Sequence, residues 1–432
     1  MDFSIFAYVA ILLLVALLST RLVRILKLPN VTGYIVTGII MGPFVFGLLF
    51  NNFSYDSIKE SLIYKHVNTI NWVSTVALGF IAFSIGTSFK KSTIKALGKR
   101  VLIITALEAL SATLLVLITL LILHFIFPDY ISIELVLTLA AIASATAPAA
   151  TLMVIKQYQA RGPLVDTLLP VVALDDAAAL ILFAIFFQLA NTFASDVPLS
   201  IYTVLLKPLI EIAISLVSGL VIGLFISFMN RFFKSRNNRL IWCIFSVFAA
   251  LGIYMLFKSP IFNGGFELSS LLICMMAGAI YTNFVSDSNR TLDVMDRFTS
   301  PIYMMFFVIS GASLDLTIFF NRNGLIIMGI AATYVIFRFV GKWIGAYSGA
   351  SITRCEDKIK KYLGFALIPQ AGVAIGLATT AYTLFNKNPE TALAGSLILA
   401  IILTSTLIYE LIGPMVAKFA LNKAGEIPKE NL

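Results

Sequence analysis

The sequence predicts an all-α polytopic membrane protein with about thirteen transmembrane helices, built as an inverted repeat with two crossing interrupted helices. Of the 432 residues, 59% are hydrophobic and 12% are charged, which is about half the charge of a typical soluble domain. The apolar runs are longer than the strands of a membrane barrel and do not alternate with polar residues. Two segments that break helices also lie at matching positions in the two halves of the chain.

Thirteen apolar runs are long enough to cross a bilayer, and the short loops between them make neighbouring helices antiparallel. The predicted spans cover residues 3–26, 30–50, 69–89, 101–127, 132–155, 164–190, 203–230, 239–257, 266–285, 299–320, 324–350, 361–385 and 392–417.

Lys and Arg are distributed unevenly over the loops. Of the 31 basic residues, 23 fall on one side of the membrane and six on the other, while Arg338 and Lys342 lie inside the eleventh span. By the positive-inside rule the basic side is cytoplasmic, so we expect a plasma (inner) membrane protein with its N-terminus outside and its C-terminus inside. The net charge of +9 is spread over seven segments. This spread suits anionic lipid headgroups and argues against a nucleic-acid partner.

A weak internal repeat relates the two halves. Residues 86–89 (GTSF) resemble residues 311–314 (GASL), and the same offset carries residues 144–146 onto 369–371. Both of the latter segments contain mid-span helix breakers, namely Pro148 in the first and Pro369 with Gly372 in the second. Seven spans separate the copies, so spans 1–6 and 8–13 form an inverted repeat with span 7 as the linker. Paired interruptions of this kind predict a transport site at their crossing.

Polar side chains accompany both breaks. Ser144 and Thr146 lie near the first break and Gln370 lies in the second. Backbone that is irregular at membrane depth survives only inside protein or beside water, so we expect these residues to help bind a cation. The simpler alternative is a proline kink whose hydroxyl groups bond back to their own helix.

Asp175 and Asp176 lie together in the otherwise apolar run 170–187. A carboxylate in a bilayer core costs at least ~2.5–3.5 kcal/mol, and such residues are usually functional. Their side chains point about 100° apart on a helix, so one can pair with Lys342 while the other faces a cavity. This pair predicts a site for a monovalent cation and a proton. A permanent salt bridge that only fixes packing is the alternative, and Arg338 is either a gating residue or a structural cation.

Glu108 lies well inside the fourth span and is a candidate for the proton path, or for a contact between helices. The three cysteines have no metal-binding spacing, and no catalytic constellation of a soluble enzyme is present. We therefore expect a protein that is not an enzyme and has no cofactor besides the ions it transports.

The order of motifs resembles the sodium/proton antiporters of the monovalent cation/proton antiporter superfamily, and most closely the NapA-like and Kef-like branch. These motifs are ATAP at 145–148, LDDAA at 174–178, GKxxGA at 341–346 and IPQAG at 368–372, with GYIVTGIIMGP near the start and YELIGP near the end. The resemblance covers nearly the whole chain.

The resemblance implies that Asp176 carries both the cation and the proton, that Asp175 pairs with Lys342, and that exchange is electrogenic. It also implies a homodimer in which a core moves as an elevator against a scaffold. The expected parts are scaffold and dimer helices at 1–100, the first half of the core at 101–190, and linker and scaffold helices at 191–320. The second half of the core follows at 321–420, and a short cytoplasmic tail at 421–432.

Two other transport functions stay open. A Kef-like exchanger would carry potassium in exchange for protons. Such systems usually have a cytoplasmic nucleotide-binding domain, and we expect only a short tail at 421–432 after the last span. A sodium-coupled transporter of organic anions would need a cationic pocket, to which Arg338 is the one evident contributor.

Overall fold

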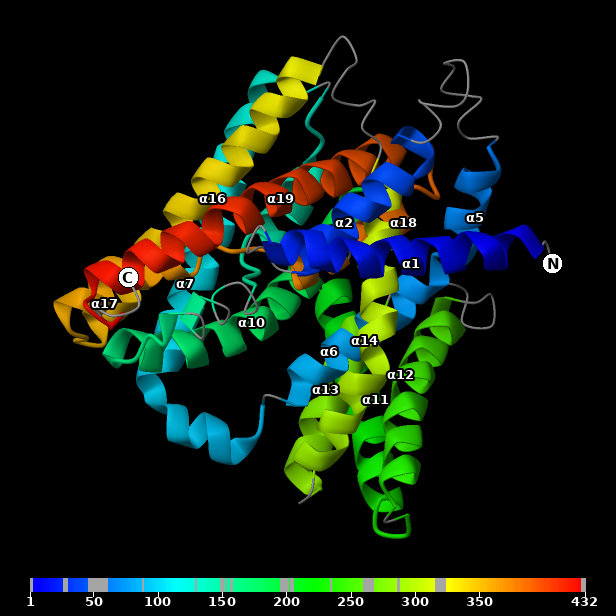
Figure 1. Cartoon of the computed structure of the whole chain (residues 1–432), viewed down its shortest axis with the longest axis horizontal. Coiled ribbons are helices and arrows are strands. Elements are labelled where there is room, and N and C mark those ends of the chain that lie inside the picture. Colours follow the sequence, from blue (N-terminus) through cyan, green and yellow to red (C-terminus); the bar gives the residue numbers. More distant parts are fainter. Residues whose placement is uncertain are drawn as a thin grey trace.

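The computed structural model describes residues 3–25, 30–45, 61–87, 89–128, 130–147, 151, 154–155, 158–194, 202, 206–233, 235–258, 268–285, 288–314 and 324–428. These residues form an all-helical fold (Figure 1). Within them, eight helices are long and apolar enough to cross a membrane, and shorter apolar helices accompany them. The predicted all-α membrane fold is therefore confirmed, and the number of thirteen spans and the inverted repeat stay predictions.

The first half of the chain contributes seven helices to the described part. They are α1 (Phe3–Ile25), α2 (Asn30–Met41), α5 (Leu62–Ile70), α6 (Trp72–Thr87), α7 (Lys91–Ile126), α8 (Ile133–Ile142) and α10 (Pro163–Phe193). Three of them differ clearly from the predicted spans: α5 precedes the third span, 69–89, almost entirely. Helix α7 begins about ten residues earlier, because a short helical turn precedes a bend at Gly98, and α8 ends within its predicted span.

The second half contributes the remaining described helices: α11 (Lys207–Met229), α12 (Arg236–Lys258), α13 (Ser270–Phe284), α14 (Ser288–Ala312), α16 (Gly324–Ile352), α17 (Asp357–Ala366), α18 (Gly372–Phe385) and α19 (Ala392–Lys423). Helix α14 begins before its predicted span and α19 continues beyond it. The twelfth predicted span is divided into α17 and α18 by residues 367–371, as the breakers at Pro369 and Gly372 predict.

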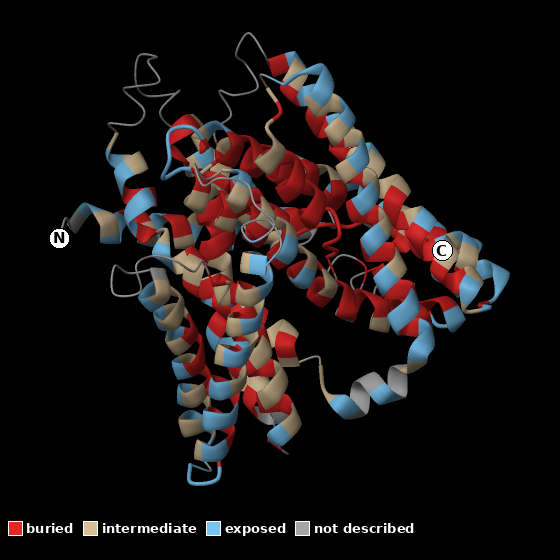
Figure 2. Ribbon diagram, turned by 180° about the vertical axis from the view of Figure 1, so that it is seen from behind, coloured by how far each residue is buried: buried red, intermediate tan, exposed pale blue. Residues whose placement is uncertain are grey.

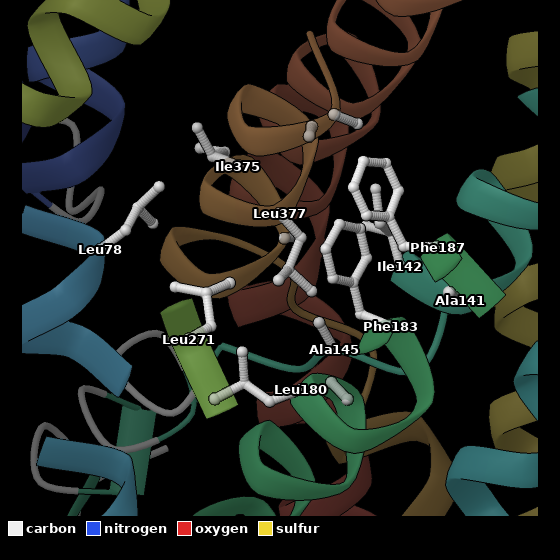
Figure 3. Packing of buried hydrophobic residues seen from close by; sticks show 14 of the residues in the cluster. Leu78, Ala141, Ile142, Ala145, Leu180, Phe183, Phe187, Leu271, Ile375 and Leu377 are labelled. Carbon is white, nitrogen blue, oxygen red and sulfur yellow. The ribbon is translucent and has the colours of Figure 1, made fainter. Parts of the chain in front are cut away.

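The helices pack in two groups (Figure 1). Helix α6 packs on α13, which also packs on α11, and α14 packs on α2. In the other group α7 runs along α16, α8 packs on α10, and α18 and α17 pack on α19. A large apolar cluster lies between the groups and includes Leu78 of α6, Phe183 of α10 and Leu377 of α18, with Leu377 beside Phe183 (Figure 3).

Many residues on the outward helix faces are exposed (Figure 2), and large apolar side chains are among them. Examples are Leu14 and Leu18 on α1, Ile118 and Ile122 on α7, and Val221 on α11. Soluble monomers rarely expose apolar surface on this scale. These faces fit contact with lipid chains.

A row of glycines brings α16 unusually close to α7. Gly341, Gly345 and Gly349 lie one turn apart, and a Cβ atom at these positions would come within 2.5–2.8 Å of Cα atoms in α7, including that of Glu108. Small residues spaced by four let helix backbones approach closely. Lys342 belongs to the same stretch of α16, so the glycine row places it against the carboxyl group of Glu108.

Candidate functional site

The two helix breaks meet inside the molecule. The backbone N–H of Ala147 donates to the carbonyl of Pro369 at 2.8 Å. Thr151 donates to the carbonyl of Ala366 at 3.0 Å, and the amide of Gln370 donates to the carbonyl of Ile142 at 3.1 Å. The non-helical segments 143–147 and 367–371 are therefore hydrogen-bonded to each other across more than 200 residues of sequence. Pro148 itself lies outside the described residues.

Helix α10 carries the aspartate pair to this crossing. Its first turn is held by the tail of the chain, because Glu426 accepts hydrogen bonds from the backbone N–H groups of Leu164 and Val165 at 2.6 and 2.9 Å. A carboxylate is well placed at a helix N-terminus, where unpaired N–H groups and the helix dipole favour negative charge. Further along the helix, Asp175 is completely buried, whereas Asp176 keeps 8% of its surface exposed.

Lys342 is the centre of the buried ionic cluster. Its Nζ atom lies 2.7 Å from Asp175 Oδ2, 2.6 Å from Thr146 Oγ1 and 2.5 Å from Glu108 Oε1, and it also donates to the carbonyl of Ser144. Lys342, Asp175 and Glu108 have no exposed surface. One ammonium group therefore joins helices α7, α10 and α16 to the first helix break.

The ammonium group has three N–H donors, and hydrogen bonds to Ser144, Thr146 and Asp175 use all three. Glu108 is a fourth neighbour, whose Oε1 atom lies 2.5 Å from the ammonium nitrogen. Two carboxyl groups thus share one cation in a site without water-accessible surface.

Arg338 lies one turn before Lys342 on α16 and is fully buried. Its guanidinium group donates to the carbonyls of Ala143 (3.0 Å), Ala145 (2.6 Å) and Ile368 (2.7 Å). The first two belong to the first break and the third belongs to the second. The guanidinium group also lies over the ring of Tyr409, 4.5 Å from its centroid. Arg338 therefore satisfies carbonyls that lack helical partners at both breaks.

Ser144 and Gln370 use their side chains within the fold. The Ser144 hydroxyl donates to the carbonyl of Ala141, and its carbonyl group receives Lys342. The Gln370 amide donates to Tyr334 Oη at 2.9 Å as well as to Ile142, and its oxygen accepts from Ser405 at 3.4 Å. The structure brings both residues to the crossing, where their side chains bond to protein groups.

Asp176 differs from the other acids of the site because no ion pair joins it to a described cation. Its Oδ1 atom, like Oδ1 of Asp175 and both carboxyl oxygens of Glu108, is buried without a hydrogen-bond partner among the described residues. A buried carboxylate with no partner is costly. A proton or a cation bound to it would remove that cost.

A cavity of about 160 Å³ lies between the two groups of helices and is lined on α10 by residues that begin at Phe183, about two helical turns beyond Asp176. Phe183 and Gln188 of α10 and Thr379 of α18 line one side of it, and Thr75 of α6 and Ser270 of α13 line the other. Phe183 follows Asp176 by seven residues, which places both on one face of α10. The cavity is thus on the side of the helix to which Asp176 points.

The sequence did not indicate three contacts of the site. They are the carbonyl contacts of Arg338, the ion pair of Glu108 with Lys342, and the cap that Glu426 forms on α10. The glycine spacing 341, 345, 349 is a signal from which the α7–α16 contact was predictable. Among the described residues no cluster of three His, Cys, Asp or Glu side chains fits a tightly bound metal.

Interrupted helices that cross beside buried acids define a secondary-transport fold. Residues 9–421 match the family model described as "Sodium/hydrogen exchanger, transmembrane", and the chain belongs to this family of monovalent cation/proton antiporters. No curated protein matches the chain.

Two solved structures of the sodium proton antiporter MjNhaP1 from Methanocaldococcus jannaschii have the same fold. The first, determined at pH 8, has a TM-score of 0.68 and 19% sequence identity, and the match covers 97% of this chain and 99% of that one. The second, from electron microscopy, has a TM-score of 0.68 and 17% identity, with 96% and 98% covered.

Proposed function

We propose that this protein exchanges sodium, and also lithium, for protons across the plasma membrane, and that Asp176 is the site both ions share. One observation carries the proposal. Asp175 and Glu108 both form ion pairs with Lys342, whereas Asp176 forms none with a described cation, and its buried Oδ1 atom has no hydrogen-bond partner among the described residues. Sodium is a hard cation that prefers oxygen ligands, and unwound backbone carbonyls commonly supply the others in transporters.

Sharing one carboxylate couples the two fluxes. A proton and a sodium ion cannot occupy Asp176 together, so each ion that binds displaces the other. Both forms neutralise the carboxylate, which lowers the cost of moving it through a region of low dielectric. When Asp176 is ionised and has no bound ion, the free energy of moving its carboxylate through that region stays high, so movement of the empty site is disfavoured. Coupling then needs no further residue.

Movement between the two groups of helices completes the proposed cycle. The core would comprise 101–190 and 321–420, and the scaffold 1–100 and 191–320, with a homodimer formed through the scaffold. The cavity beside α10 supports this division, because its walls come from both groups. We propose that the core moves as an elevator and that the N-terminus is outside and the C-terminus inside. Electrogenic exchange is part of the proposal, and the paired aspartates with a lysine support it.

The cation can be identified in proteoliposomes that contain the purified protein. With a pH gradient imposed, we expect sodium or lithium added outside to dissipate the gradient, and potassium to have no effect. Clamping the membrane potential with valinomycin and potassium tests electrogenicity, since a potential should change the rate only if net charge moves.

Two outcomes would contradict this proposal. Dissipation by potassium alone would assign the chain to Kef-like potassium/proton exchange. A folded protein that responds to none of the three cations would favour sodium-coupled transport of an organic anion. Arg338 gives that second reading little support, because its guanidinium group is buried and donates to three backbone carbonyls.

A further inference from the structure

The connector between the apolar helices that end at Thr87 and begin at Gly98 comprises residues 89–100 and is strongly basic. Five cations lie within eleven residues, Lys90, Lys91, Lys95, Lys99 and Arg100, and the sequence has no Asp or Glu between Glu60 and Glu108. Lys91, Lys95, Lys99 and Arg100 are all exposed. None of them forms an ion pair with an acid of the described chain. The charge of this segment is therefore uncompensated within the described residues.

Gly98 gives the connector a direction different from that of the span it precedes. The residue has φ 72° and ψ 169°, which interrupts the helical geometry of α7. A Cβ atom at Gly98 would meet nothing within 4 Å, so glycine is needed here for backbone conformation and not for space. The first part of α7, from Lys91 to the bend at Gly98, therefore runs in a different direction from the rest of α7 (Figure 1).

Both ends of the connector are fixed to protein. Asn283 of α13 accepts from the backbone N–H of Lys91 at 2.8 Å and donates to the carbonyl of Phe89 at 2.9 Å. At the other end, Arg100 donates to the carbonyl of Arg354, just beyond α16, at 3.5 Å. The connector thus links the two groups of helices, one containing α6 and α13 and the other containing α7 and α16. It also lies between two apolar helices, one of which ends at Thr87 while the other begins at Gly98.

We propose that residues 89–100 form a docking surface for anionic phospholipid headgroups at the cytoplasmic face of the membrane. Spans on both sides hold the connector at the membrane surface, where anionic lipids attract basic segments. Lys91 and Lys95 are four residues apart and share one helix face. The lipid contact would then act on the segment that links the two groups of helices, whichever cation the protein carries.

The test compares lipid selectivity in reconstituted full-length protein. Spin-labelled phosphatidylglycerol and phosphatidylcholine report which lipid the protein surface prefers. The wild type should prefer phosphatidylglycerol. In the triple variant Lys91→Gln/Lys95→Gln/Lys99→Gln, the ratio of phosphatidylglycerol to phosphatidylcholine binding should fall at least about five-fold, which is the loss expected for one surface charge. High salt should weaken the wild-type preference through screening.

A matched control removes three exposed cations elsewhere on the predicted cytoplasmic side: Arg297→Gln/Lys358→Gln/Lys361→Gln. It changes the net charge equally and should keep the preference. Equal lipid selectivity in the wild type and the connector variant would overturn the proposal. Equal loss of selectivity in the connector and control variants would also overturn it, because the preference would then come from overall charge or from lipid bound elsewhere. An acidic protein partner for the connector would also leave the lipid selectivity unchanged. Because the readout is lipid binding, it is independent of whether sodium/proton exchange is found.

Discussion

Replacing Asp176 by Asn is expected to abolish sodium-driven proton flux, reducing the rate in proteoliposomes by at least about a hundredfold, to the level of protein-free vesicles. The amide has the size of the carboxyl group but binds no exchangeable proton in this pH range and holds a cation only weakly. Because Asp176 forms no ion pair with a described cation and its buried Oδ1 atom has no hydrogen-bond partner among the described residues, neutralising the side chain removes an unpaired charge. The variant should therefore melt at a temperature no lower than that of the wild type.

Asp166→Asn is the matched control for this result. Asp166 lies in the first turn of the same helix α10 and is exposed, so its loss should leave exchange unchanged. Sodium-driven proton flux of wild-type size in a folded Asp176→Asn protein would show that the shared carboxylate lies elsewhere.

Replacing Lys342 by Met is expected to destabilise the protein by about 3–5 kcal/mol, because it leaves buried charge without its partner. Asp175 Oδ2 and Glu108 Oε1 lie 2.7 and 2.5 Å from the ammonium group, and all three side chains are completely buried. The change is measurable as a fall in the thermal unfolding temperature in a fixed detergent. Lys387→Met, in an exposed loop, should have no comparable effect.

A triple variant separates charge from packing. Lys342→Met combined with Asp175→Asn and Glu108→Gln removes the two acids together with the cation, and replacing a whole buried ionic cluster is often close to neutral. We expect it to regain most of the lost stability. Equal destabilisation of the single and triple variants would mean that Lys342 acts through shape and not through charge.

The sequence was sufficient to predict the helical fold and the position of the second helix break. Long apolar runs have few alternatives to a spanning helix, and Pro369 has no backbone N–H with which to continue one. The aspartate pair and Lys342 were recognisable because charge at membrane depth is rare. These signals are local, so they are visible without knowledge of the packing.

The contacts between distant segments were not predictable in the same way. Arg338 bonds to carbonyls of two breaks that are separated by more than 200 residues, and nothing in its own neighbourhood of the sequence indicates this. The place of Glu108 depends on how closely α7 approaches α16, which the glycines at 341, 345 and 349 decide. For the polar residues Ser144 and Gln370, residue type suggested cation binding, whereas their side chains bond to neighbouring protein groups.

The measurement that bears most directly on a single shared carboxylate is the apparent KM for sodium as a function of pH, at equal pH on both sides of the vesicles. If a proton and a sodium ion compete for Asp176, KM should rise about tenfold for each unit of falling pH once the carboxylate is mostly protonated, while the maximal rate at saturating sodium stays constant. An apparent KM that does not change with pH while the maximal rate falls would contradict competition, and would require separate sites for the two ions.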